Sequence, residues 1–171
     1  MHTHHESEDK GILPVVPVGD IPQEESPRRW LIENLWGARA VGIICGNPKL
    51  GKSWLGLDMA VSVATGTPCL GRYPVLEPGR ALIYLAEDPL PSLRERVRSI
   101  GRSRGLSLDL MDLQVITASR LRLDHKDDRA CLVETVRRLR PRLLLLDPLV
   151  RLHGVNENDA REISELLSFL R

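Results

Sequence analysis

The stretch that decides the fold runs from residue 41 to residue 53 and reads VGIICGNPKLGKS. Its first five residues are apolar and predict a short buried strand that ends at Gly46. Residues 46–53 fit the pattern G-x-x-x-x-G-K-[ST]. Residues 54–65 are rich in Leu, Met, Ala and Val and predict a buried helix, which Gly66 and Pro68 bring to an end. A strand, a glycine loop and a helix in this order are typical of the start of an α/β domain.

The loop at residues 46–53 has the composition of a phosphate-binding loop. Gly46 and Gly51 let backbone N–H groups turn toward phosphate oxygens, and the helix that follows points its positive end at the same anion. Lys52 is expected to reach the β- and γ-phosphates, and the Ser53 hydroxyl to bind Mg²⁺. The predicted nucleotide-binding residues are Gly46, Asn47, Pro48, Lys49, Leu50, Gly51, Lys52, Ser53 and Trp54. The alternative is a glycine-rich turn without a ligand.

The rest of the chain alternates between apolar runs and amphipathic segments. Apolar runs at residues 81–86, 113–117 and 143–146 predict strands, and segments at 91–104, 127–140 and 157–171 predict helices. Asn156 or Asn158 is the expected cap of the last helix. Because the strands are apolar throughout rather than alternating, we expect a mostly parallel sheet with helices on both faces.

Residues 1–27 are predicted to be a disordered or extended tail, and residues 28–171 to be the globular domain. The tail is acidic and proline-rich and has too little apolar surface to offset the entropy of ordering. Its histidines His2, His4 and His5 are expected to be solvated; the alternatives are a metal site or a cloning remnant.

Composition excludes several classes of protein. The chain has 171 residues and a net charge of +1, which argues against nucleic-acid binding through overall charge. With 42% hydrophobic and 27% charged residues it is too apolar for a disordered chain, and 4% aromatic residues disfavour a base-stacking surface. No apolar run reaches the roughly 20 residues that span a membrane. Three separated cysteines indicate reduced thiols and a cytoplasmic protein.

Two predicted strands end in carboxylates. The run at 143–146 is followed by Asp147, the place from which a carboxylate binds Mg²⁺; the alternative is a turn-forming residue. Pro148 follows, so a catalytic base must come from elsewhere. The run at 81–86 ends in Glu87 and Asp88, and we expect Glu87 to deprotonate the attacking water if the two strands are neighbours. The alternative is that Glu87 and Asp88 begin the next helix, with Asp88 as its cap.

Together these residues resemble the RepA-type ATPases, hexameric replicative helicases of the RecA-like P-loop ATPases within the AAA family, often found on plasmids and mobile elements. The resemblance covers residues 30–171 and rests on Trp30-Leu31-Ile32, residues 46–57, 64–66, 70–71 and 79–88, Asp147-Pro148-Leu149 and residues 156–158. It implies a RecA-like fold, binding of ATP and Mg²⁺, catalysis by Lys52 and Glu87, metal binding by Ser53 and Asp147, and a homo-oligomeric ring with nucleotide at its subunit interfaces.

The resemblance also predicts a gap in the sheet. Members of the family continue beyond the last helix into a strand that inserts between the phosphate-loop strand and the strand ending in Asp147. This sequence ends at Arg171, before that strand. We therefore expect a sheet without a central strand and with unpaired edges. Our hypothesis is a truncated product that keeps a nucleotide-binding half-site and hydrolyses ATP poorly.

The functional expectation is a magnesium-dependent ATPase linked to DNA replication or helicase activity. One alternative is an ATP-binding regulatory or scaffolding module without effective hydrolysis. A P-loop kinase is less favoured, because no arginine-rich lid follows Asp147. DNA binding follows only from the resemblance; arginine rows at 94–104 and 137–142 either contact DNA or form solvated helix faces. Arg120 and Arg122 are expected in a loop that faces the nucleotide or a neighbouring subunit.

Overall fold

The core of the molecule is a three-stranded parallel sheet. The computed structural model describes residues 13–22, 29–154 and 160–171. Within them, the strands β3 (Ala81–Leu85), β4 (Leu113–Val115) and β5 (Leu143–Asp147) lie in the order β4-β3-β5. The pairing of β3 with β5 runs in register from Ala81↔Leu143 to Leu85↔Asp147. The three predicted strands after residue 80 are therefore confirmed, and they are parallel.

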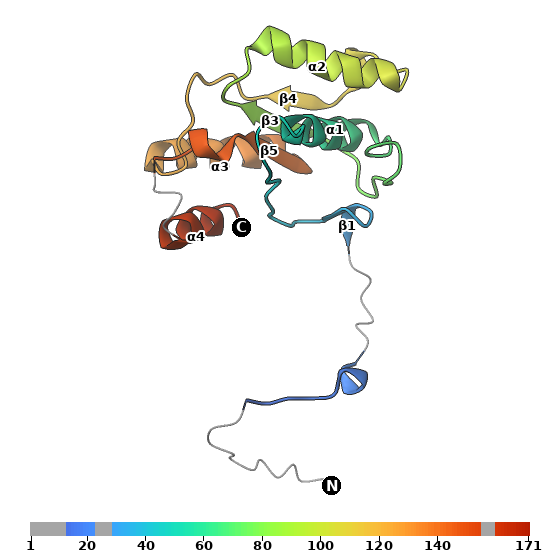
Figure 1. Ribbon diagram of the computed structural model, residues 1–171. Helices are drawn as coiled ribbons and strands as arrows, with labels where there is room; N and C mark the ends of the chain where they lie inside the picture. The colour runs from blue at the N-terminus through green and yellow to red at the C-terminus, as the bar shows by residue number, and fades with distance from the viewer. Residues whose placement is uncertain (1–12, 23–28, 155–159) are drawn as a thin grey trace.

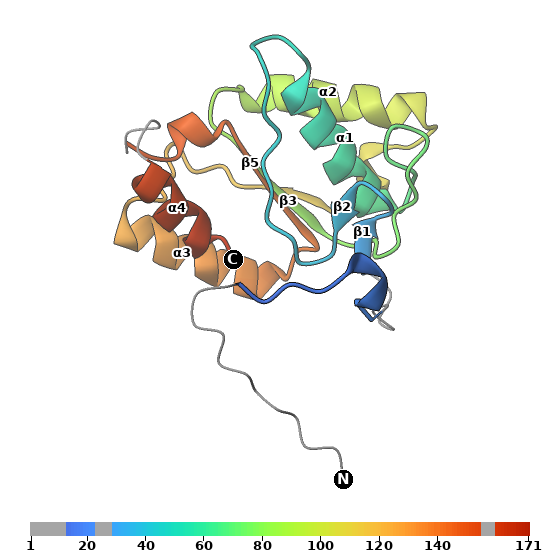
Figure 2. The same cartoon turned by 60° about the horizontal axis from the view of Figure 1, so that its bottom comes forward.

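Helices cover both faces of this sheet, as the apolar strands predict. The helices are α1 (Lys52–Thr65), α2 (Leu90–Ser103), α3 (Lys126–Leu139) and α4 (Ala160–Phe169). Side chains alternate along each strand, so Ile83 and Leu145 pack in one cluster with α1 and α2. Tyr84 and Leu146 pack in a second cluster with α3 and α4. Figure 1 and Figure 2 show the helices around the sheet. The α/β fold class is thereby confirmed.

Short elements complete the described chain. A hairpin of β1 (Trp30–Ile32) and β2 (Trp36–Gly37) packs Leu31 and Ile32 into the cluster around α1. Three-residue 3₁₀ helices are η1 (Val18–Asp20), η2 (Leu108–Leu110) and η3 (Leu149–Arg151). Sequence analysis did not predict the hairpin. Residues 1–12 and 23–28 lie outside the described residues, so the boundary at residue 27 stays a prediction.

The predicted strand at residues 41–45 is wrong. This segment has no strand pairing, and Val41 and Ile43 are exposed. It lies across a cavity from β5, whose second edge has no strand partner among the described residues. A strand requires a hydrogen-bonded neighbour, so an apolar pattern alone does not make one. The Trp36 indole holds the segment instead, because a Cβ at Gly42 would lie 2.7 Å from the ring.

The predicted helices are confirmed, with shifted ends. Gly66 ends α1 in the left-handed conformation that a side chain rarely adopts. Residues 157–159, the predicted first turn of the last helix, lie outside the described residues, as do both of its expected caps, Asn156 and Asn158. The positions of these helices therefore follow from local sequence patterns.

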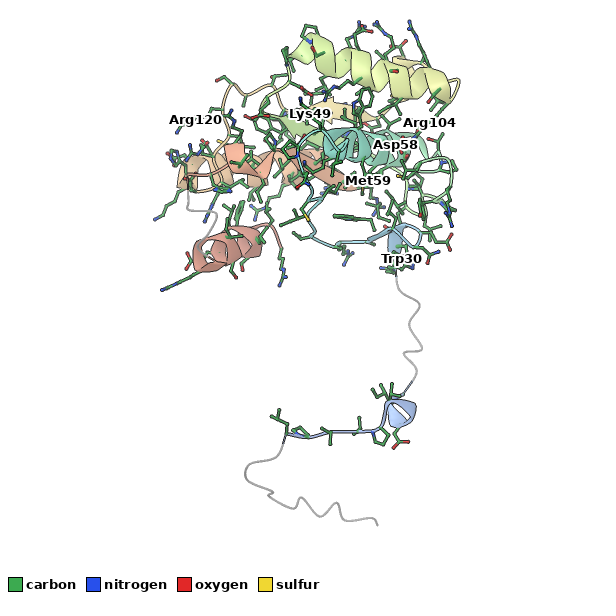
Figure 3. All side chains as sticks on the ribbon, in the orientation of Figure 1. Trp30, Lys49, Asp58, Met59, Arg104 and Arg120 are labelled. Atoms are coloured by element: carbon green, nitrogen blue, oxygen red, sulfur yellow. The ribbon has the colours of Figure 1, made fainter. Side chains whose placement is uncertain are left out.

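A partly buried polar network joins α1 to the residue after α2. Arg104 forms an ion pair with Asp58 and donates through Nη1 to the hydroxyls of Ser62 (2.9 Å) and Thr67 (2.7 Å). Figure 3 shows Arg104 and Asp58 side by side. Burial, together with the Asp58 carboxylate, raises the pKa of the nearby Cys69 thiol to about 12. The network therefore fixes the two helices against each other and keeps Cys69 protonated.

Candidate functional site

The loop before α1 presents backbone donors at the start of a helix. Gly51 precedes the helix with φ 81°, a left-handed conformation that explains why glycine stands there. The first helical bond runs from Leu55 N–H to Gly51 O, so the N–H groups of residues 52–54 have no partner within the helix. Such groups, with the helix dipole behind them, bind anions.

Lys52 lies back over the beginning of the same loop. Its Nζ donates to the carbonyl oxygens of Gly46 (2.7 Å) and Asn47 (2.9 Å). An ammonium group has three donors, and two of them are used here. The third is available to an anion bound within the loop, which fits the predicted contact of Lys52 with phosphate.

The structure brings Lys52, Ser53 and Asp147 to one cavity of about 270 Å³. Its other walls come from residues 39–44, from β5 and from Leu167 and Leu170 of α4. Asp147 is the last residue of β5, and the carboxyl end of parallel strands is where α/β proteins bind ligands. A hydroxyl and a carboxylate are hard oxygen donors that suit Mg²⁺, which usually keeps several water ligands besides. The residues present thus fit the predicted metal.

Glu87 lies near this cavity but lines another pocket. Leu85 is in register with Asp147, so Glu87 stands two residues beyond the neighbour of Asp147. The two strands are neighbours, as the expectation for Glu87 required. Glu87 shares a pocket of about 390 Å³ with Tyr84, Ser119, Arg120 and Arg151, and Lys52 and Asp147 do not line it.

Each of the two carboxylates after β3 has its own arginine. Arg96 of α2 donates to Asp88 Oδ2 at 2.6 Å, and Arg151 Nε donates to Glu87 Oε1 at 2.8 Å. α2 begins at Leu90, and Asp88 makes no capping hydrogen bond to it. The alternative in which Asp88 caps this helix is therefore wrong. Asp88 instead ties the turn to α2.

Trp54 contacts α2 rather than the cavity of Lys52. The Arg96 guanidinium lies 5.4 Å from the centre of its ring, and the side chain is 45% exposed. A nucleotide contact for Trp54 stays a prediction. The same holds for the contacts predicted for Pro48, Lys49 and Leu50, which are exposed in the loop.

Several arginines that were candidates for ligand contact have partners within the chain. Arg98, Arg104 and Arg142 pair with Glu95, Asp58 and Glu77. Arg122 pairs with Asp124; this contact and the N–H of Gly154 hold the pKa of the Asp124 carboxyl well below its usual range, and Asp124 raises the pKa of Arg122. Arg120 lines the pocket of Glu87. Sequence analysis missed Arg151, whose only signal was a basic residue soon after Asp147.

Comparison with known proteins identifies the family. Among the described residues, no helix is long and apolar enough to cross a membrane. A search of curated proteins found no match. A family model described as an AAA domain matches residues 6–171, which is nearly the whole chain. With its phosphate loop and parallel sheet, the chain belongs to this family of AAA-type P-loop ATPases.

Proposed function

We propose that this protein binds Mg-ATP at the loop of residues 46–53 and hydrolyses it to ADP and phosphate. The observation that carries the proposal is the meeting of Lys52, Ser53 and Asp147 at one cavity, at the carboxyl end of β5. Lys52 offers a cation to the phosphates, and Ser53 and Asp147 offer a hydroxyl and a carboxylate to the metal. The three residues come from two elements far apart in the sequence. The family supports nucleotide binding in general.

The chain's own groups divide the work of this reaction. The N–H groups of residues 52–54, which have no partner within the helix, and the Lys52 ammonium hold the phosphates and offset their charge. Ser53 and Asp147 would hold the magnesium, which supplies charge neutralisation at the transferred phosphoryl group. Glu87 accepts a proton from the attacking water. The water oxygen bonds to the γ-phosphorus, the bond from this phosphorus to the bridging oxygen breaks, and ADP leaves.

A narrower role as a RepA-type helicase belongs to the same proposal. Ring assembly, DNA binding, a place in replication and a cytoplasmic location rest on the sequence and its resemblance alone. One observation favours the alternative of an ATP-binding module without effective hydrolysis: Glu87 lines a pocket that Lys52 and Asp147 do not line.

Thermal unfolding with and without Mg-ATP tests the binding step. A ligand at about 100 times its dissociation constant stabilises a protein by about 2.7 kcal/mol. We expect Mg-ATP to raise the melting temperature of the wild type and not that of Lys52→Ala. Lys126→Ala is the matched control, since it removes an exposed lysine from the first position of another helix, α3, and should keep the rise. An equal rise in the wild type and Lys52→Ala would overturn the assignment of the loop.

Glu87→Gln then separates hydrolysis from binding. If Glu87 is the base, steady-state hydrolysis should fall about 10²- to 10⁴-fold, while the Mg-ATP-dependent rise in melting temperature persists. A wild type that binds Mg-ATP without Lys52-dependent turnover would support the regulatory module instead.

A further inference from the structure

The ion pair between Arg151 and Glu87 joins two segments at the carboxyl edge of the sheet. Arg151 ends η3, and its backbone N–H donates to Pro148 O at 3.1 Å. The next residue, Leu152, is fully buried, and its carbonyl accepts from the N–H of Leu123. Arg151 thus projects from a turn that is anchored on both sides. Such an anchor lets the guanidinium hold Glu87 in one place.

We propose that Arg151 is a positioning residue for Glu87. Its Nε–H holds Oε1 of the carboxylate, and Oε2, which has no partner among the described residues, is left to accept a hydrogen bond from the attacking water. This inference rests on the proposed function. It adds a residue that acts through the base rather than on the substrate.

The exposure of the pair indicates orientation rather than stability. The side chains of Arg151 and Glu87 are 64% and 55% exposed, and exposed ion pairs contribute little to folding. The neighbouring pair of Asp88 and Arg96 is less exposed, and its Arg96 guanidinium lies 5.4 Å from the centre of the Trp54 ring. The arginines of the two pairs come from different elements, α2 and η3, and they bind consecutive carboxylates. The turn after β3 is therefore fixed by Arg96, and the direction of Glu87 by Arg151.

Substitutions at Arg151 test this role in the full chain. We expect Arg151→Gln to lower kcat for ATP hydrolysis about 10- to 100-fold, because a misplaced reacting group costs this much, with KM for ATP and the melting temperature little changed. Arg151→Lys should restore part of kcat, since it keeps the charge and loses the planar donor. Arg98→Gln is the matched control: it breaks another partly exposed arginine pair, with Glu95 on α2, and should keep wild-type kcat.

A double substitution shows whether Arg151 acts through Glu87. In single-turnover measurements, Arg151→Gln should cause no further loss when Glu87 is already Gln. The inference is overturned if Arg151→Gln leaves Lys52-dependent hydrolysis intact. It is equally overturned if the loss is as large in the Glu87→Gln background, or if kcat and melting temperature fall together without rescue by Lys. Absence of Lys52-dependent hydrolysis in the wild type would overturn the proposed function and this inference with it.

Discussion

At Gly56, α1 packs closely against β5. A Cβ on this residue would lie 3.0 and 3.2 Å from the two methyl carbons of Leu145. Ser53 stands one turn earlier on the same helix, so this close approach sets how near the phosphate loop comes to the end of β5. A glycine in the middle of a helix costs stability by itself, so its presence here has a packing reason.

Enlarging Gly56 should therefore destabilise the fold. We expect Gly56→Val to lower the free energy of unfolding by about 1–3 kcal/mol, since a larger side chain is forced against Leu145. Denaturant unfolding measures the change. Ser99→Val, at an exposed position of α2, controls for placing a β-branched residue in a helix. If the two variants lose equal stability, the contact with Leu145 does not restrict the site.

At this scale the sequence predicted the residues of a contiguous motif and missed those that depend on distant partners. Lys52, Ser53 and Asp147 were predicted because a loop pattern and a strand end mark them, and they line one cavity. The pairs of Arg151 with Glu87 and of Arg96 with Asp88 join residues from different elements. No local pattern carries such a pairing. The catalytic and ligand roles of all these residues remain proposals.

Among the elements, helices were predicted well and strands only in part. Helices α1, α2 and α3 follow from periodicity and from their end signals, which are local properties. The segment at 41–45 has the composition of a buried strand but no hydrogen-bonded neighbour. The hairpin of β1 and β2 is too short for a periodic pattern to show. Strand formation depends on a neighbouring strand in the sheet, and a local sequence pattern does not show which neighbour is present.

Asp124 connects the loop before α3 to the segment after η3. Its carboxylate accepts from Arg122 Nε (3.0 Å) and Nη2 (2.9 Å), and from the N–H of Gly154 (2.9 Å). These contacts hold the pKa of Asp124 well below its usual range, the arginine contributing most. The charged form therefore stabilises the folded state. The same two segments are joined by a backbone bond from Leu123 N–H to the carbonyl of Leu152, the residue next to Arg151.

Removing this charge should weaken the fold in a pH-dependent way. We expect Asp124→Asn to cost about 1–2 kcal/mol at neutral pH. Because the folded pKa is lowered, this stabilisation is complete above about pH 4, the ordinary value, and is lost as the pH falls through the folded pKa. Denaturant unfolding at several pH values should show the difference between wild type and variant shrinking in acid. Asp109→Asn, at an exposed position in η2, should show no such trend; a constant difference for Asp124→Asn would contradict the assignment.

For the whole molecule, the unusual property is the position of β5 at an edge of the sheet. The strand has four leucines, of which Leu143 is buried and the others are partly buried. The edge of β5 that does not pair with β3 faces the cavity bounded by residues 39–44. The resemblance predicted a gap between a phosphate-loop strand and the strand ending in Asp147; the segment at 41–45 forms no strand, so the missing strand stays a prediction. An apolar strand with a free edge is a surface that another strand can pair with.

The free edge of β5 should make the rate of amide hydrogen exchange alternate from one residue of this strand to the next. Ala86 N–H donates to Asp147 O at 2.9 Å, and the register pairs Leu82 with Leu144 and Tyr84 with Leu146. By alternation the amides of Leu145 and Asp147 therefore face β3, and those of Leu144 and Leu146 face the cavity. We expect slow exchange at Leu145 and Asp147 and fast exchange at Leu144 and Leu146, whereas β3, paired on both sides, should be protected along the part that contacts both neighbours. Uniformly slow exchange along β5 would mean that something already covers its second side. Alternating rates would mark a strand that is held on one side and open to water, or to a strand from elsewhere, on the other.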